Sequence, residues 1–382
     1  MTIHKTRIYF DHAATTPIDK EVLESMMPFL TSEFGNASSV HWFGQTAAVA
    51  VEKARRQAAD ALNCRANEIY FTSGATESNN TVIKGLAQPG QHIIVSQIEH
   101  PSILEPAKIM ERWGIEVTYL PPDSNGLVSV EAVSRAVKDS TVLVSVMYVN
   151  NEIGTVQPIA EIGRLIRELN QSRKQRIFFH TDAVQAANYC ELDVEALGVD
   201  LLSLSGHKVY GPKGIGLLYR KAEVPLQSLL SGGGQEYGFR SGTLNVPAIV
   251  GFGRALELAS KNRISDTKKI LELRDYLINL ILKKVPQARL NGDSEHRVAN
   301  NANVLFPESE GETVLMLLDQ AGFAVSSGSA CSSGSLDPSH VLLALGLDAT
   351  AAKASVRFSL GRGNNKKQID NLILALLEAL QK

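Results

Sequence analysis

The stretch Leu201-Leu-Ser-Leu-Ser-Gly-His-Lys-Val-Tyr-Gly-Pro-Lys-Gly-Ile-Gly216 decides how the rest of the chain is interpreted. A predicted apolar strand over residues 199–204 ends at Ser205-Gly-His-Lys208, and a glycine-rich turn leads to a second strand over residues 216–219. An amine at the end of a buried strand is well placed to form a Schiff base with an aldehyde cofactor, and Ser205 and His207 could bind its phosphate. The pattern therefore indicates pyridoxal phosphate, although a lone turn lysine is ordinarily only solvated.

Outward from this stretch, short apolar strands alternate with amphipathic helices from about residue 45 to residue 220. The predicted helices cover residues 45–62, 102–113, 129–137 and 159–170, and the predicted strands cover residues 68–71, 92–96, 116–120 and 141–147. This alternation predicts a mainly parallel sheet covered by helices on both faces. In such sheets ligands gather at the carboxyl ends of the strands.

A long predicted helix over residues 246–285, which residues 262–265 could interrupt, leads out of this α/β unit. The remainder, with predicted strands over residues 303–306 and 355–359, is typical of a smaller α/β domain. We expect a large domain over residues 15–257, and a small domain formed by residues 1–14 and 258–382.

The composition excludes several classes of protein. The 382 residues include 38 basic and 40 acidic ones, and no charge run points to nucleic acid or to an anionic membrane surface. The first eight residues lack the apolar core of a secretory signal, and no apolar stretch is long enough to span a bilayer. Cys64, Cys190 and Cys331 are far apart, which argues against a disulfide framework or a metal site and fits a reducing cytoplasm.

The run Thr72-Ser-Gly-Ala-Thr-Glu-Ser-Asn-Asn80 follows a predicted strand and opens a helix. The backbone N–H groups of Ala75 and Thr76, the Thr76 hydroxyl and the helix dipole together form an anion site. The plainer interpretation is an ordinary helix start with Glu77 as a capping acid. In a chain that also carries Lys208, a phosphate cradle is the better interpretation.

Further polar residues follow other predicted strands. Asp182 would keep the ring nitrogen of the cofactor protonated, and Gln185, one helical turn later, could hydrogen-bond its phenolic oxygen. The simpler role of Asp182 is to cap a helix. His100 could stack on the cofactor ring and move protons near neutral pH, although a single histidine is more often structural.

The small domain supplies two candidates for the substrate. Arg357 lies in an alternating strand, where a guanidinium could hold a substrate carboxylate or form a structural salt bridge; Arg240 is a competing anion binder. Cys331 lies in the run Ser326-Ser-Gly-Ser-Ala-Cys-Ser-Ser-Gly-Ser335, which is predicted to be an exposed loop. A thiol in such polar surroundings is a candidate nucleophile, and an inert loop cysteine is the alternative.

Taken in order, these segments resemble the cysteine desulfurases, the NifS/IscS-like branch of pyridoxal phosphate enzymes. The resemblance covers essentially the whole chain and rests on eight motifs: Tyr9-Phe-Asp-His-Ala-Ala-Thr-Thr-Pro17, Phe34-Gly-Asn-Ala-Ser-Ser39, Thr72-Ser-Gly-Ala-Thr-Glu-Ser78, Val149-Asn-Asn-Glu-Ile-Gly154, His180-Thr-Asp-Ala-Val-Gln185, Ser205-Gly-His-Lys208, Arg240-Ser-Gly-Thr243 and Ser327-Gly-Ser-Ala-Cys-Ser332. It implies the aspartate aminotransferase-like fold of pyridoxal phosphate-dependent transferases, with the catalytic cysteine in the loop over residues 326–337.

The resemblance also implies roles for single residues. Lys208 would be the Schiff-base lysine, Cys331 the persulfide carrier, and Thr243 would reach the phosphate bound by the other subunit of a homodimer. The remaining cofactor contacts would come from Ala75, Thr76, His100, Asn151, Asp182, Gln185, Ser205 and His207. Asn151 and Arg357 would also bind the substrate, L-cysteine, whose sulfur passes to Cys331 while L-alanine leaves.

Two questions stay open at this point. Family members that serve the scaffold protein of iron–sulfur assembly often end in an extra docking tail, whereas this chain ends at Lys382 after its last predicted helix. The sulfur acceptor could therefore be that scaffold or a tRNA-thiolating enzyme. A selenocysteine or cystine lyase of the same fold, which would not need Cys331, and a catalytically silent scaffold are the alternative functions.

Overall fold

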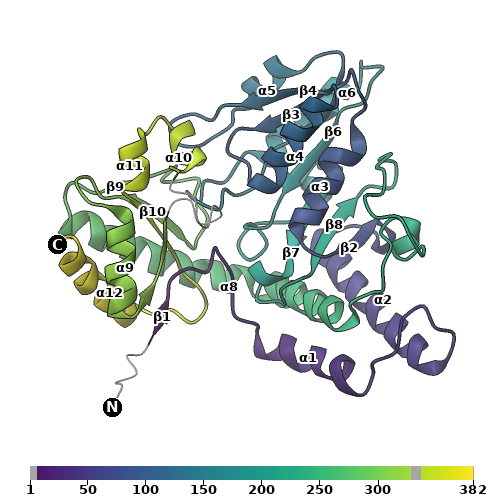
Figure 1. Ribbon diagram of the computed structural model, residues 1–382, viewed down its shortest axis with the longest axis horizontal. Helices are drawn as coiled ribbons and strands as arrows, with labels where there is room; N and C mark the ends of the chain where they lie inside the picture. Colours follow the sequence, from purple (N-terminus) through teal and green to yellow (C-terminus); the bar gives the residue numbers. More distant parts are fainter. Residues whose placement is uncertain (1–6, 328–336, 382) are drawn as a thin grey trace.

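A seven-stranded sheet forms the centre of the larger part of the molecule, in the order β2-β8-β7-β6-β5-β3-β4 (Figure 1). The computed structural model describes residues 7–327 and 337–381. The strands are β2 (Ile69–Thr72), β3 (His92–Ser96), β4 (Glu116–Leu120), β5 (Thr141–Ser145), β6 (Phe178–Asp182), β7 (Leu201–Ser205) and β8 (Gly216–Arg220). Only β8 runs antiparallel to its neighbours within this sheet, which confirms the predicted mainly parallel sheet.

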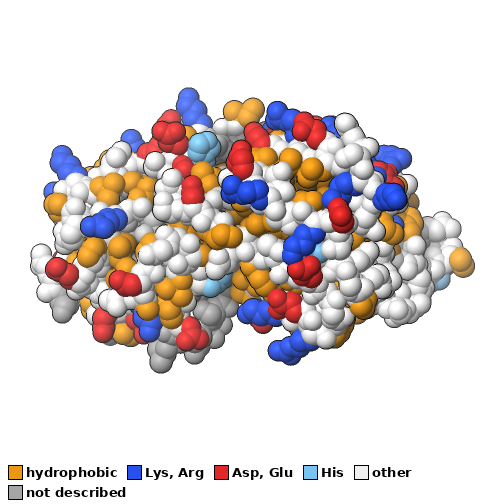
Figure 2. Space-filling model, turned by 90° about the horizontal axis from the view of Figure 1, so that it is seen from above, with side chains coloured by type: hydrophobic (Ala, Val, Ile, Leu, Met, Phe, Trp, Pro, Cys, Tyr) orange, Lys and Arg blue, Asp and Glu red, His pale blue; other side chains and the backbone are white. Residues whose placement is uncertain are grey.

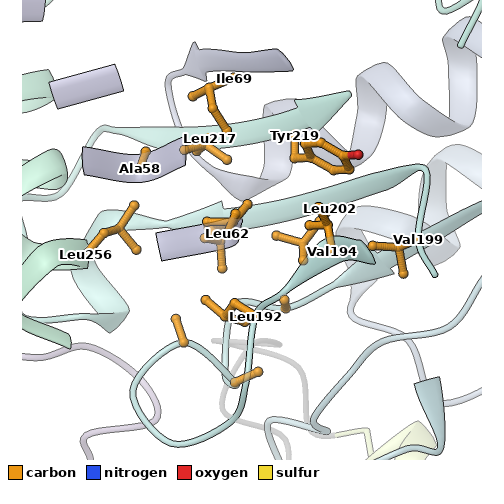
Figure 3. Packing of buried hydrophobic residues seen from close by; sticks show 14 of the residues in the cluster. Ala58, Leu62, Ile69, Leu192, Val194, Val199, Leu202, Leu217, Tyr219 and Leu256 are labelled. Atoms are coloured by element: carbon orange, nitrogen blue, oxygen red, sulfur yellow. The ribbon is translucent and has the colours of Figure 1, made fainter. Parts of the chain in front are cut away.

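Most strands of this sheet are buried along their whole length because helices cover both of its faces, whereas the edge strand β4 is only partly buried. On one face, Leu217 and Tyr219 of β8 pack with Leu62 of α2 (Trp42–Leu62) and Leu256 of α8 (Val246–Lys284) (Figure 3). On the other face, Leu218 of β8 packs in a second cluster with residues of two further helices, α3 (Ala75–Leu86) and α4 (Pro101–Arg112). Successive side chains of β8 thus point to opposite faces of the sheet, and the core consists of one apolar layer on each face.

The remaining helices of this part of the chain complete its surface. They are α1 (Lys20–Thr31), α5 (Val130–Ala136), α6 (Ile159–Asn170) and α7 (Val194–Leu197), with short 3-10 turns η1 (Ala66–Glu68), η2 (Gly206–Lys208) and η3 (Glu236–Gly238). Most predicted boundaries hold within a few residues. The predicted start of α2 at residue 45 is late, because His41 caps the helix by accepting a hydrogen bond from the backbone N–H of Gly44 at 3.3 Å.

A single helix, α8, links the two hydrophobic cores. Its first half packs in the core under the large sheet, and its second half, from Ile270 onward, packs in the core of the smaller domain (Figure 1). The predicted interruption at residues 262–265 is wrong: the helix runs through them, since neither glycine nor proline lies between Gly253 and Lys284. The continuous helix gives the domains a rigid connection.

The smaller domain contains a four-stranded antiparallel sheet in the order β12-β13-β10-β9. Its strands are β9 (Arg289–Leu290), β10 (Asn301–Leu305), β12 (Ser326–Ser327) and β13 (Ser355–Ser359), and its helices are α9 (Gly311–Ala321), α10 (His340–Ala344), α11 (Ala349–Lys353) and α12 (Lys366–Ala379). The N-terminal strand β1 (Ile8–Tyr9) pairs in parallel with β11 (Phe323–Ala324). The first described residues therefore pack with the small domain, and the chain then crosses to the large sheet.

The outer surface carries charges of both signs. Figure 2 shows Lys and Arg side chains interspersed with Asp and Glu over one face of the molecule, in keeping with the net charge of −2. Among the helices of the described residues, none combines the length and the apolar character needed to cross a bilayer.

Truncation of the core leucine Leu202 to alanine should lower the free energy of unfolding by about 3 kcal/mol, because it removes buried methyl groups and leaves a cavity. Leu374→Ala, whose parent side chain is 64% exposed on α12, serves as the control and should change stability by less than about 0.5 kcal/mol. Urea unfolding followed by circular dichroism measures both. Equal effects of the two substitutions would contradict the described packing.

Candidate active site

A cavity of about 620 Å³ lies at the carboxyl ends of the central strands and reaches the small domain at Arg357. Of the eleven predicted site residues that the structure describes, ten line it: Ala75, Thr76, His100, Asn151, Asp182, Gln185, Ser205, His207, Lys208 and Arg357. The eleventh, Thr243, is exposed and does not line this cavity. The edge of the sheet brings these residues together because the carboxyl ends of parallel strands share one side.

Lys208 projects from the 3-10 turn that follows β7. Its Nζ donates hydrogen bonds to the carbonyl oxygens of Ala13 and Ala14, the latter at 2.7 Å. Gln185 Nε2 donates to the same Ala13 oxygen at 2.9 Å. The residues between β1 and α1 thus hold both side chains, a role for Ala13 and Ala14 that the sequence reasoning missed.

The phosphate end of the cavity combines the start of α3 with the tip of β7. Gly216, at the start of β8, lies so close to Gly74 that a Cβ atom there would come within 2.4 Å of the Gly74 carbonyl carbon. Burial first, and then the nearby charges of Lys208 and Lys213, lower the pKa of His207 to about 4. The imidazole is therefore neutral near pH 7 and offers a hydrogen bond rather than a charge to a phosphate.

Asp182 ends β6 as a nearly buried carboxylate. Its Oδ2 accepts a hydrogen bond from Asn79 Nδ2 at 2.7 Å, and its Oδ1 accepts from the backbone N–H of Val184 at 3.0 Å. The residues after it form turns rather than the predicted helix, so Gln185 does not lie one helical turn on. Asn79 was not predicted, although it lies four residues after Ala75 and hence on the same face of α3.

His100 caps the start of α4 and joins the same network. Its Nδ1 lies 2.8 Å from Ser102 Oγ, and Ser102 Oγ accepts from Asn79 Nδ2 at 2.8 Å. Burial has the largest effect on the pKa of His100 and lowers it. The charge of Asp182 raises this pKa and the charge of Lys208 lowers it, so that the pKa lies below its ordinary value. A neutral ring linked through Ser102 and Asn79 to Asp182 can both stack on a flat ligand and accept a proton.

Arg357 reaches the cavity from β13 of the small domain. Its Nη2 pairs with the carboxylate of Asp11 at 2.9 Å, and its Nη1 donates to the carbonyl oxygen of Asn151 at 2.8 Å. Its Nε is buried and has no hydrogen-bond partner among the described residues. The side chain therefore forms the structural salt bridge of the alternative interpretation, and its Nε–H is still available to a substrate carboxylate.

Two of the three cysteines, Cys64 and Cys190, lie in the described part of the chain, and both are free thiols. Burial, as the largest cause, raises the pKa of both Cys64 and Cys190 to about 12, so neither thiol forms a thiolate near neutral pH. Cys331 lies outside the described residues. Arg240, the competing anion binder, does not line the cavity; it pairs with Glu77.

The donor set of the cavity fits pyridoxal phosphate. Lys208 supplies an amine for the aldehyde, Asp182 a buried carboxylate for the ring nitrogen, and His100 a flat ring. The start of α3, Ser205 and the neutral imidazole at the β7 tip supply donors for the phosphate. Each group of the cofactor thus has a matching residue within one cavity.

Replacement of Asp182 by alanine should weaken the binding of pyridoxal phosphate and slow turnover by several orders of magnitude, each tenfold corresponding to about 1.4 kcal/mol. The reason is the loss of the partner that keeps the ring nitrogen protonated. Asn79→Ala keeps the carboxylate and removes the hydrogen bonds from Asn79 to Asp182 and Ser102, so it should cost only about 1 kcal/mol of binding. Fluorescence titration with the cofactor measures both. If Asp182→Ala kept the parental affinity for pyridoxal phosphate and the parental turnover rate, Asp182 would only cap the turn that follows β6.

The comparisons with known proteins agree with this site. The sequence pattern of the class-V aminotransferases matches residues 8–372. The cysteine desulfurase IscS of Methanosarcina thermophila is 48% identical over 379 residues, which cover 98% of this chain and 92% of that protein.

Solved structures extend the likeness to the fold. A NifS-like protein superimposes with a TM-score of 0.92 at 37% identity and covers 98% of this chain and 100% of its own. SspA in complex with cysteine superimposes with a TM-score of 0.81 at 39% identity and covers 93% and 99% of the two chains. The expected aspartate aminotransferase-like fold is thereby confirmed. The chain belongs to the class-V aminotransferase family and, within it, to the pyridoxal phosphate-dependent cysteine desulfurases of the IscS group.

Proposed function

We propose that the protein removes the sulfur of L-cysteine, releases L-alanine and carries the sulfur as a persulfide on Cys331 to an acceptor protein. The observation that carries this proposal is the convergence, in one cavity, of the Lys208 amine, the Asp182 carboxylate and a phosphate cradle, with Arg357 of the small domain beside them. The family gives the same activity to its members.

Pyridoxal phosphate, when bound, supplies an electron sink for the breaking of bonds to the substrate carbons. Lys208 would hold the cofactor at its aldehyde carbon and would move protons between the substrate carbons. Asp182 would keep the ring nitrogen protonated, and His100 would stack on the ring and accept a proton. Gln185 would hydrogen-bond the phenolic oxygen.

Two residues would orient the substrate. The Nε–H of Arg357, which has no partner among the described residues, would bind the carboxylate of L-cysteine, while Nη1 and Nη2 hold the guanidinium in place through Asn151 and Asp11. Arg357 donates to the backbone carbonyl of Asn151 at 2.8 Å, so the two residues lie side by side in the cavity, and the Asn151 side chain would contact the same substrate. The substrate sulfur is then presented to a nucleophile from the small domain.

The nucleophile would be Cys331. Its thiolate attacks the sulfur of the substrate, an S–S bond forms, and the C–S bond breaks with its electron pair left on the substrate carbon. Protonation of that carbon yields the methyl group of L-alanine. Cys64 and Cys190 cannot take this part, because burial raises the pKa of each thiol to about 12.

Replacement of Cys331 by serine should leave the affinity for pyridoxal phosphate unchanged and abolish the formation of sulfide from L-cysteine. Serine has nearly the same size but cannot form a persulfide. Mass spectrometry of the parent after incubation with L-cysteine should find one added sulfur on the peptide with Cys331 and none on those with Cys64 or Cys190. Full turnover of the serine variant would favour the selenocysteine or cystine lyase instead.

A second copy of the chain would complete the cofactor site. Thr243 is exposed outside its own cavity, which fits a contact with the phosphate bound by a partner. Helix α1, the segment that follows it and the first turns of α2 expose a series of large apolar side chains, as an interface does: Leu23, Met27, Leu30, Phe34, Val40, Trp42 and Val49. We therefore propose a homodimer with shared sites.

Mixed dimers test this arrangement. When a Lys208→Ala subunit pairs with a Thr243→Ala subunit, one site should regain an intact lysine from one chain and an intact threonine from the other. We expect about half of the parental activity, although each homodimer of the variants is impaired. The two subunits carry different affinity tags so that only mixed dimers are assayed. A mixed dimer no more active than the Thr243→Ala homodimer would place the threonine in the site of its own chain.

The acceptor of the sulfur would be an iron–sulfur scaffold protein or a tRNA-thiolating enzyme, and the protein would act in the cytoplasm. The reducing conditions there would keep the thiol of Cys331 available for each turnover. Transfer of ³⁵S from L-cysteine to each class of purified acceptor would separate the two.

A further inference from the structure

An acidic residue lies where the phosphate cradle needs positive charge. Glu77, in the first turn of α3, lines the cavity beside Ala75 and Thr76, and its Oε2 accepts a hydrogen bond from the backbone N–H of Ser73 at 2.8 Å. A carboxylate at this end of a helix neutralises the positive end of the helix dipole. The same neutralisation works against the binding of a phosphate dianion.

The Glu77 side chain is charged near neutral pH. Burial raises its pKa, but hydrogen bonds from Arg240 and Ser73 outweigh burial and leave the pKa below its ordinary value. Its side chain is only 10% exposed, so solvent screens the charge weakly. An uncompensated Glu77 would therefore repel the phosphate.

Arg240 supplies the compensating charge. Its Nε donates to Glu77 Oε1 at 2.8 Å and its Nη2 donates to Glu77 Oε2 at 3.1 Å, so the pair is bidentate. Such a fork holds the guanidinium in one orientation next to the carboxylate.

The segment that carries Arg240 is itself fixed to the large domain. Glu236 is buried, and its carboxylate accepts from Arg55 Nη1 at 2.9 Å, from Arg55 Nη2 at 2.7 Å and from the backbone N–H of Phe71 at 2.7 Å. The backbone of Glu236 has φ +48°, a left-handed conformation that a non-glycine residue adopts only when its contacts hold it there. Arg240 thus reaches the cradle from an anchored loop.

We propose that Arg240 is a positioning residue for the cofactor phosphate, which makes the cradle electropositive by compensating the charge of Glu77. The inference rests on the proposed cofactor site but not on the chemistry of cysteine. Arg240 does not line the cavity; it acts through Glu77. The alternative role is a purely structural clamp between the loop and α3.

Single substitutions separate the two roles by the sign of their effects. Arg240→Ala should weaken the binding of pyridoxal phosphate about tenfold. Glu77→Gln keeps an oxygen for the Ser73 N–H and removes the charge, so it should tighten binding about threefold. A structural clamp predicts that both substitutions weaken binding, because either one releases the loop.

The double variant and the choice of ligand complete the test. Glu77→Gln with Arg240→Ala should bind pyridoxal phosphate within about threefold of the parent, since neither charge remains. Pyridoxal, which lacks the phosphate, should bind all variants within about twofold of the parent. Dissociation constants from fluorescence titration of the apoprotein give these values without any assay of activity.

Two further variants control for folding. Arg240→Lys keeps the charge and should bind pyridoxal phosphate within about threefold of the parent. Arg263→Ala removes an arginine of similar exposure that pairs with Glu191 away from the cavity, and should not change the affinity. The proposal is overturned if Glu77→Gln and Arg240→Ala weaken binding alike, or if Arg240→Ala weakens pyridoxal as much as its phosphate. A parent that binds the phosphate but forms no sulfide would overturn the proposed function alone.

Discussion

The site depends on one buried carboxylate, that of Asp182 at the end of β6. A charge that is 5% exposed is stable only when hydrogen bonds replace its water, and here Asn79 and the backbone N–H of Val184 supply them. Asn79 can do so only because the first turns of α3 pack against the ends of the central strands. The same asparagine reaches Ser102, which holds the ring of His100. The hydrogen bonds around one carboxylate therefore tie α3, α4 and β6 together at the cavity, on top of the apolar packing of both helices against the sheet.

The second constraint is the rigid attachment of the small domain. Helix α8 packs in both hydrophobic cores. In a separate apolar cluster, Val341 and Leu342 of α10 pack with Ile98 and Ile153 of the large domain. Arg357 can then reach across to Asn151. The small domain contributes Arg357 to the cavity and, in our proposal, Cys331 as the nucleophile. In the function that we propose, the large domain would perform the ring chemistry, and the small domain would orient the substrate and receive its sulfur.

The electrostatics of the cavity follow from burial. Burial keeps His207 neutral by lowering its pKa to about 4, and it lowers the pKa of His100 as well. The positive charge near the phosphate would then come from Lys208, from the helix dipole of α3 and, in our proposal, from Arg240 beyond Glu77. Each of these sources is held by backbone or side-chain hydrogen bonds. The cofactor would meet a preorganised set of donors, which avoids the cost of ordering them on binding.

The sequence by itself determined the central strands and the residues at their ends. Apolar runs such as His92–Ser96 are recognisable because both faces of the sheet are buried, and the shared edge of parallel strands brings Asp182 and Lys208 into one cavity. Only the tertiary structure decided the contacts between distant segments: Asn79 with Asp182, Lys208 with Ala13, and Glu77 with Arg240. These pairs are separated by about a hundred residues or more, so no local pattern encodes them. Helix α8 is uninterrupted because packing in two cores outweighs the weak propensity of its polar middle. The roles of Thr243 and Cys331 stay predictions, since one awaits a second subunit and the other lies outside the described residues.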